Sequence, residues 1–194
     1  MILFLDLETN GLSKSLNAPI EDIENWARIV QISWSIFDDT GKMIKKENFI
    51  IFPFDFTISD TSSLIHGINT KRAEQEGVLL NKVLYKFNDD LEKCDLVVAH
   101  NIGFDIPTLN AEFVRNKIKT TLLEKPTFCT MKSPEIICYC EIPHPRGSGF
   151  KWPTLSELYQ ILFNESFKDV HNASADVDAC ARCYFELKRR KIIE

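Results

Sequence analysis

Residues 1–12 read MILFLDLETNGL, and the rest of the expected sheet is arranged around them. The apolar run at its start is typical of a short buried strand. Because side chains along a strand point to alternate faces, we expect Asp6 and Glu8 on one face and the leucines between and around them on the other. We expect Thr9-Asn10-Gly11 to turn the chain, with Gly11 free to adopt a positive φ. The acidic pair then lies at the carboxyl end of a strand, where open α/β sheets place their sites.

A second acidic block follows another candidate strand, residues 95–99. His100 and Asn101 come next and are expected to open a helix, with Asn101 as its N-cap. Asp105 lies four residues later, so Asn101 and Asp105 are expected to share a helix face. An acid near a helix N-terminus also suits the helix dipole, so this block alone leaves a structural role open. Apolar residues recur at helical spacing through the same segment: Ile102, Ile106, Leu109 and Phe113.

The third block, HNASAD, covers residues 171–176. We expect a helix from about Ser174 to Lys191, with Asp176 in its first turn and His171 just before it. Asp178 lies two residues further, about 200° around the helix, so only one of the two acids can face a site. The spacing predicts that His171 and Asp176 meet at one cleft, and that Asp178 is a solvated acid or a dipole partner.

Taken together, the three blocks indicate a particular chemistry. Each block alone is also compatible with solvated acids, but converging carboxylates are costly unless cations neutralise them. Oxygen ligands suit Mg²⁺ or Mn²⁺ better than Zn²⁺. A histidine beside them can act as a base near neutral pH. These groups together are the equipment for two-metal hydrolysis of a phosphodiester.

The remaining elements follow from periodicity. Apolar residues at helical spacing predict an amphipathic helix over residues 79–94. Thr154 and Glu157 form a capping-box pattern ahead of another helix. Strands are expected at residues 29–37 and 43–52, joined as a hairpin, and near residues 95–99 and 127–130. With the first strand, they make five strands in one sheet.

Composition is that of one globular domain, and we expect residues 1–194 to form it. The first apolar run is too short for a membrane span and follows no basic segment, so we expect a cytoplasmic protein without a membrane anchor. The six cysteines lack a disulfide-framework spacing and are interpreted as reduced thiols. Cys180 and Cys183 are interpreted as small buried side chains of a helix. A structural zinc site is a minor alternative, since a fourth ligand is missing from Cys138, Cys140 and His144.

The net charge of −5 argues weakly against nonspecific nucleic-acid binding, although two divalent ions would offset four acids. The loop at residues 143–152 interleaves cations with aromatics, as strand-binding surfaces do. An ordinary loop explains that segment slightly better. Basic residues expected near the site are Lys14, Lys132, Arg146 and Lys151.

The order DLETNGL, HNIGFD and H-x-x-x-x-D resembles the DnaQ-like 3′–5′ exonucleases, the histidine branch of the DEDD superfamily. The resemblance covers almost the whole chain and includes the segments at residues 28–34, 65–68 and 151–158. It implies an RNase H-like α/β fold, with a central mixed sheet and helices on both faces. It departs from the family in residues 13–25, which are longer than the usual first turn and are expected to form a lid, an interface or a plain insertion.

The resemblance also implies roles for individual residues. Asp6 would bridge two Mg²⁺ ions, for which Mn²⁺ can substitute. Glu8 and Asp176 would hold the ion that carries the attacking water, Asp105 would hold the other, and His171 would be the general base. Leu12 would pack against the terminal base. Further substrate contacts are expected from four residues: Thr9, His66, Asn101 and Phe104.

We therefore expect a 3′–5′ exonuclease that releases nucleoside 5′-monophosphates from DNA or RNA, most readily from a single strand with a free 3′ end. Two alternatives stay open. One is a proofreading-type subunit that acts beside a polymerase on a separate chain. The other is an RNase H-like endonuclease, which would not need a strand end.

Overall fold

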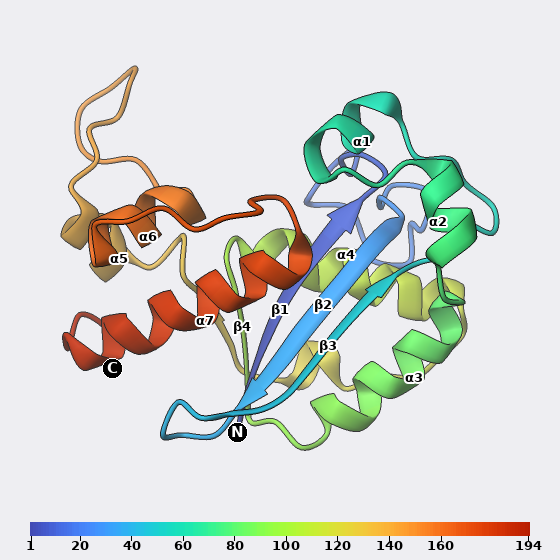
Figure 1. Cartoon of the computed structure of the whole chain (residues 1–194), viewed down its shortest axis with the longest axis horizontal. Coiled ribbons are helices and arrows are strands. Elements are labelled where there is room, and N and C mark those ends of the chain that lie inside the picture. The colour runs from blue at the N-terminus through green and yellow to red at the C-terminus, as the bar shows by residue number, and fades with distance from the viewer.

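The computed structural model describes residues 1–194 and contains one mixed sheet with the strand order β3-β2-β1-β4-β5 (Figure 1). Its strands are β1 (Ile2–Thr9), β2 (Ile29–Phe37), β3 (Met43–Ile50), β4 (Leu96–Ala99) and β5 (Thr127–Cys129). Strands β1, β2 and β3 pair antiparallel, whereas β4 runs parallel to both β1 and β5. The predicted five-stranded mixed sheet is confirmed.

Helices cover both faces of this sheet, as predicted (Figure 1). Helices α3 (Leu80–Leu91) and α4 (Ile102–Arg115) pack on one face. Helices α5 (Pro134–Cys140), α6 (Leu155–Phe163) and α7 (Ala173–Arg189) pack on the other. Two short helices, α1 (Asp60–His66) and α2 (Thr70–Glu76), lie beyond the end of β1, and a single 3₁₀ turn spans Leu122–Glu124. No helix of the structure is long and apolar enough to cross a membrane.

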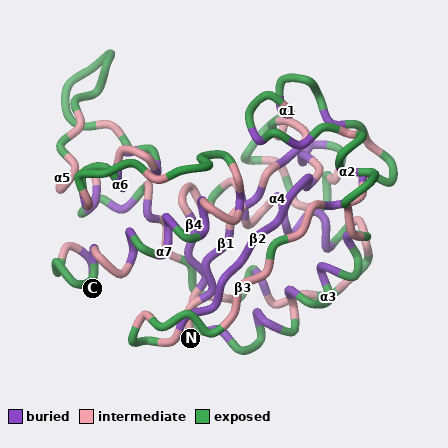
Figure 2. The backbone as a smooth tube through the Cα atoms, viewed as in Figure 1, coloured by how far each residue is buried: buried purple, intermediate pink, exposed green.

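Strand β1 is the central strand of the sheet and is largely buried (Figure 2), and a hydrophobic core lies on each face of the sheet. Leu3, Leu5 and Leu7 point into the core formed with α3 and α4. Phe4 points into the opposite core, where its ring meets the edge of the Tyr184 ring on α7 at a centroid distance of 5.4 Å. Since side chains alternate along a strand, Asp6 and Glu8 continue the row of Phe4 and face α7. The predicted two-sidedness of this strand is confirmed.

Most predicted elements are present with small shifts at their ends. Strand β3 ends at Ile50 rather than residue 52, and α7 starts at Ala173 and ends at Arg189. The β2–β3 turn is built on Asp38, whose Oδ1 accepts from the backbone N–H groups of Thr40 and Lys42. Gly11 does not adopt the expected positive φ, because Thr9 Oγ1 donates to the Gly11 carbonyl and closes the turn without it.

Three short helices were not predicted: α1, α2 and α5. Each has seven residues, which is too short for a hydrophobic period to stand out. Their sequence signals are capping residues at the helix ends instead of an apolar helix face. The Ser59 and Asn69 side chains accept from the first turns of α1 and α2, and Pro134 occupies the first turn of α5.

Candidate active site

Strand β1 carries two of the acids to the centre of the sheet. Asp6 lies opposite Ser33 and Glu8 opposite Gln31 in the antiparallel register with β2. Both carboxylates are half-buried and face α7. Because the chain turns away directly after Thr9, the pair stands at the carboxyl end of β1, beside the carboxyl end of the parallel strand β4.

Helix α4 starts at that same edge and brings in Asp105. This residue lies in the first turn of α4 and is only 3% exposed. Burial raises the pKa of Asp105 to about 8, although N–H groups of Leu7 and of Asp105 itself act to lower it. Asn101 occupies the N-cap position of α4, as predicted, but it adopts a left-handed conformation with φ of 70° and its side chain makes no capping bond. Asn101 therefore stands before the helix and shares no helix face with Asp105.

The start of α7 supplies the third block. Asp176 lies in its first turn, and the Asn172 side chain caps the helix by accepting from the Ser174 N–H at 3.1 Å. His171 has a left-handed backbone with φ of 66°, and its N–H donates to Asp176 Oδ2 at 3.0 Å. Ligand atoms of Glu8, His171 and Asp176 all lie within 4.8 Å of one another. The structure thus brings the first and third blocks together.

A pocket of about 410 Å³ opens at this point. It contains four residues expected from the sequence, Asp6, Asn101, His171 and Asp176. Sequence reasoning did not assign the other residues of its wall, which are His100, Met131, Thr154, Leu155, Ser156 and Val170. Two of these had a signal in the sequence: His100 stands directly before Asn101, and Thr154 belongs to the capping-box pattern with Glu157, which the structure confirms.

His100 ties together three segments of the pocket wall. Its Nε2 lies 3.2 Å from the Pro153 carbonyl and its Nδ1 lies 2.9 Å from Thr130 Oγ1. A carbonyl can only accept, so Nε2 carries the proton and the Thr130 hydroxyl donates to Nδ1. Burial lowers the pKa of His100 to about 4, so the ring is neutral near pH 7. The loop before α6 is thereby fixed to the ends of β4 and β5.

Gln31 performs a similar task for the start of α7. It is 2% exposed on β2, and its Oε1 accepts from the Ala173 N–H at 3.3 Å. Its Nε2 donates to Asn48 Oδ1 at 2.9 Å and approaches Asn172 Oδ1 at 3.5 Å. One buried carboxamide therefore links β2 and β3 to the helix that carries Asp176.

Asp178 behaves as predicted. It is half exposed on the outer side of α7, and its Oδ2 pairs with Lys46 Nζ at 2.6 Å. The sequence therefore identified the acid of α7 that turns away from the site.

The four acids of the site lie close together without a cationic partner from the chain. None of them forms an ion pair with a lysine or arginine of the chain. Burial, followed by the charges of Asp105, Asp176 and Glu8, raises the pKa of Asp6 well above its usual range. Burial, followed by the charges of Asp176 and Asp105, raises the pKa of Glu8 to about 8, and burial raises that of Asp176 to about 6. Such a cluster is stable in its charged form only beside cations.

The predicted substrate residues border the same edge of the sheet. Leu12 is 88% exposed just past the end of β1. His66, on α1, accepts from the Ile68 N–H through Nδ1, so its Nε2 donates to the Thr9 carbonyl at 3.3 Å. Phe104 is half-buried in the first turn of α4. Leu12 presents the most open apolar surface of these residues, and their contacts with substrate stay predictions.

None of the cysteines lines this pocket. Cys180 and Cys183 are buried within α7, which confirms their interpretation as small buried side chains. Cys138 and Cys140 lie on α5, while His144 Nδ1 accepts from the Arg146 N–H at 3.2 Å. The cluster of His, Cys, Asp and Glu with metal-compatible spacing is the one of Glu8, His171 and Asp176.

Comparison with known proteins agrees with the fold and the motifs. The DNA polymerase III PolC-type of Latilactobacillus sakei is 24% identical over 187 residues, which cover 96% of this chain and 11% of that protein. Escherichia coli exonuclease I in complex with a dA16 oligonucleotide superposes with a TM-score of 0.77 at 20% identity, covering 98% of this chain and 41% of that one. The zinc-bound complex of exonuclease I with single-stranded DNA gives a TM-score of 0.73 at 22% identity, over 98% of this chain and 40% of that one.

This chain spans about a tenth of the PolC-type protein and about two-fifths of exonuclease I. The likeness to exonuclease I supports the RNase H-like fold expected from the sequence. The model of the exonuclease family, RNase_T, matches residues 3–184. By that match, which includes all three acidic blocks, the chain belongs to the exonuclease family.

Proposed function

We propose that the chain is a metal-dependent 3′–5′ exonuclease that hydrolyses phosphodiester bonds and releases nucleoside 5′-monophosphates. One observation carries the proposal: Glu8, His171 and Asp176 meet within 4.8 Å, Asp6 lines the same pocket, and the buried Asp105 acts on Asp6 and Glu8 through its charge, without a protein cation to neutralise the four acids. Family membership supports the same activity.

Exonucleases of this family depend on divalent metal ions, and the residues at this edge fit that requirement. Carboxylate oxygens are the ligands that Mg²⁺ and Mn²⁺ prefer, and the raised pKa values of Asp6, Glu8 and Asp105 support a need for added positive charge. Asp6, Glu8, Asp105 and Asp176 would hold two Mg²⁺ ions, with Mn²⁺ as a substitute. When bound, such ions activate water and stabilise charge on the leaving oxygen.

The residues of the chain supply the remaining steps. His171 takes the proton from the attacking water, and the bond from its N–H to Asp176 keeps it beside the acids. Leu12 packs against the terminal base, since it is exposed at the end of β1. Four further residues, of which Asn101 lines the pocket, orient the terminal nucleotides in this proposal: His66, Thr9, Asn101 and Phe104.

Product ladders test this proposal. A 5′-labelled single-stranded oligonucleotide, as DNA and as RNA, should shorten one nucleotide at a time with Mg²⁺ or Mn²⁺, and EDTA should stop the reaction. A 3′ phosphate should block degradation, whereas a 5′ phosphate should not. Cleavage of a circular strand would show an endonuclease instead, and shortening from the 5′ end would contradict the proposal.

The PolC-type relative favours one narrower function, proofreading beside a polymerase. In that case the chain would act on a mismatched 3′ end presented by a separate polymerase. The test is excision of a mismatched primer end, with and without a replicative polymerase from the same cell. Faster excision of mismatched than matched ends only in the polymerase's presence supports this role, and equal rates argue for a free-standing enzyme.

A further inference from the structure

Trp152 is an exposed aromatic residue held on a fixed backbone. Its side chain is 55% exposed. The residue before it is tied down because the Lys151 N–H donates to the Ile142 carbonyl at 2.9 Å. The residue after it is tied down because the Pro153 carbonyl accepts from His100 at 3.2 Å. An indole that is both exposed and preorganised loses little freedom when it binds a ligand.

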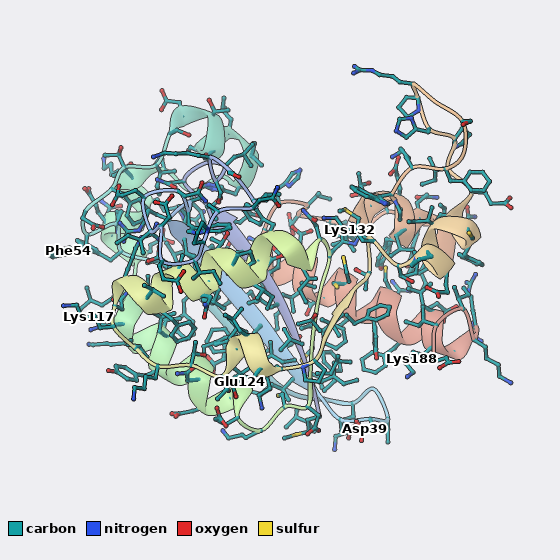
Figure 3. All side chains as sticks on the ribbon, turned by 180° about the vertical axis from the view of Figure 1, so that it is seen from behind. Asp39, Phe54, Lys117, Glu124, Lys132 and Lys188 are labelled. Carbon is teal, nitrogen blue, oxygen red and sulfur yellow. The ribbon has the colours of Figure 1, made fainter.

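A lysine stands over this indole. Lys132 Nζ lies 5.1 Å from the centre of a Trp152 ring. The two come from distant segments, yet each adjoins the wall of the site pocket: Lys132 follows Met131, and Trp152 precedes Thr154 by two residues. Figure 3 shows Lys132 beside the start of α4, and its Nζ would lie 3.7 Å from a Cβ placed on Gly103. The pair therefore stands on the rim of the pocket, next to the helix that carries Asp105.

The surroundings of this pair favour a polyanion. Residues 142–156 contain no aspartate or glutamate, in a chain that has 28 of them. The charge of Lys151 is already offset, because its Nζ binds both Glu157 oxygens at 2.7 and 2.5 Å. Lys132 has no carboxylate partner and keeps its charge available. The hairpin formed by residues 142–151 extends the same surface with Arg146 and with Phe150, which is 46% exposed.

We propose that Lys132 and Trp152 form a platform for the single-stranded nucleic acid that leaves the pocket on its 5′ side. A base stacks on the Trp152 indole while Lys132 contacts a neighbouring phosphate. Stacking on an aromatic ring is tolerant of sequence, because every base has a π-face. The inference rests on the proposed exonuclease function and adds to it a binding surface beyond the terminal nucleotides.

Two substrates of different length separate the platform from the chemistry. A dinucleotide fills the pocket only, whereas an oligonucleotide of roughly ten nucleotides also reaches the rim. The wild type should prefer the longer substrate in kcat/KM. In Trp152→Ala this preference should fall about 5–100-fold through KM for the longer substrate, and Trp152→Phe should retain most of it. Phe54→Ala is the matched control, because it removes an aromatic ring that is 82% exposed at a different surface (Figure 3).

The salt dependence of binding tests Lys132. Fluorescence anisotropy of a labelled single strand, measured in EDTA over a range of salt concentrations, gives the number of phosphates neutralised. Lys132→Gln should reduce the slope of log K against log salt by about 0.7. Lys188→Gln is the control, since Lys188 also lies over an aromatic ring, 5.9 Å from that of Tyr184, but at the far end of α7 (Figure 3).

The outcomes keep the two proposals apart. If the wild type cleaves both substrates and Trp152→Ala retains its full length preference, the platform is wrong and the exonuclease stands. If the wild type cleaves neither, the exonuclease is wrong, and the anisotropy slopes alone decide whether the platform binds a strand. Equal slopes for the wild type and Lys132→Gln would also overturn the platform.

Discussion

Asp90 and Asp105 are buried almost equally, at 1% and 3% exposure, but their surroundings differ in kind. Asp90 accepts from Lys45 Nζ at 2.6 Å and from the Trp34 indole N–H at 3.0 Å. Burial alone would raise the pKa of Asp90, but these donors, together with Lys93, lower it. Asp105 has no such cation, and burial raises its pKa to about 8. The chain can neutralise a buried acid with its own lysines, and at the candidate site it does not.

That difference indicates where an external cation belongs. A buried acid with protein partners contributes to stability, while a buried acid without them costs stability until something binds. Proteins place such uncompensated groups at functional sites. Substitutions of the site acids and of Asp90 should therefore have opposite effects on activity and on the free energy of unfolding.

Asp6→Asn should have the largest effect. We expect kcat to fall by about 10⁴-fold, because the several kcal/mol of charge stabilisation from bound metal are lost. The fold should survive, since the substitution removes one of four repelling charges. Single-turnover cleavage and calorimetric titration with Mn²⁺ check both points. Unchanged Mn²⁺ binding would sink the assignment of Asp6.

Asp90→Asn is the matched control for that experiment. It leaves Lys45 without its carboxylate partner and should lower the free energy of unfolding by about 1–3 kcal/mol. The activity of the folded protein should not change. Urea unfolding and kcat should be measured on the same preparation of each variant. If Asp90→Asn lost activity while Asp6→Asn lost stability, the structural role of Asp90 and the site role of Asp6 would both be wrong.

His171→Ala should slow the chemical step without loosening the metals, since His171 acts as the base in our proposal. The expected decrease in kcat is about 10²–10⁴-fold. Mn²⁺ affinity, measured by calorimetry, should stay near that of the wild type. If His171→Ala retained full kcat at saturating Mg²⁺, His171 would not be the general base.

Gln31→Met should have a smaller effect on activity. The substitution keeps the volume but removes the carboxamide that holds the Ala173 N–H, so the start of α7 loses its link to β2. We expect a decrease in kcat of about 10–100-fold, in the range of residues that support metal ligands. Gln31→Glu keeps the acceptor and should lose less at saturating Mg²⁺. Equal losses in both variants would mean that packing, rather than this hydrogen bond, is what matters.

The metal-free protein should become less stable as the pH rises. The pKa values of Glu8 and Asp105 are about 8 and that of Asp176 about 6, all above the values near 4 of an unfolded chain. Between about pH 4 and pH 8 the folded state therefore binds more protons than the unfolded state, so the free energy of unfolding falls with rising pH. The slope should reach about 1.4 kcal/mol per pH unit for each excess proton.

Urea unfolding in EDTA across this pH range would measure that slope. Saturating Mg²⁺ should flatten it, and Asp105→Asn should reduce it. A stability that rises with pH in EDTA would show that the four carboxylates are already compensated within the chain.

Asp178→Asn should have the smallest effect of all. Asp178 stands only two residues from Asp176 but pairs with Lys46 at a half-exposed position. Exposed ion pairs contribute about 0–1 kcal/mol, so both the thermal midpoint and kcat should stay close to the wild type. A large loss of activity would show that the site extends around α7.

The parts of the molecule that could be predicted are those that depend on residues close together in the sequence. Asp6 and Glu8 share a strand, and His171 and Asp176 share the start of a helix, so local periodicity was enough to orient them. The family and the mixed sheet with helices on both faces are confirmed. The catalytic and metal-binding roles of these residues, and the single domain over residues 1–194, stay predictions.

What the sequence did not reveal depends on contacts between distant segments. Gln31 meets Ala173 only after β2 and α7 have packed together, and no local pattern announces such a pair. The same holds for His100 and Pro153. Helices α1, α2 and α5 are each about two turns long, so tertiary packing rather than amphipathic spacing sets them. Asn101 is the N-cap of α4, as its residue type indicated, but its left-handed backbone and the missing capping bond were not predictable from residue type.

The acids of the site come from β1, α4 and α7, near the beginning, the middle and the end of the sequence. Contacts of such long sequence separation form late, because the entropy of closing the intervening chain must be overcome first. During synthesis, the segment carrying Asp6, Glu8 and Asp105 leaves the ribosome well before Asp176. A nascent or truncated chain thus has an unfinished cluster of acids and no His171. The proposed nuclease activity therefore depends on the docking of α7, which completes the cluster of acids.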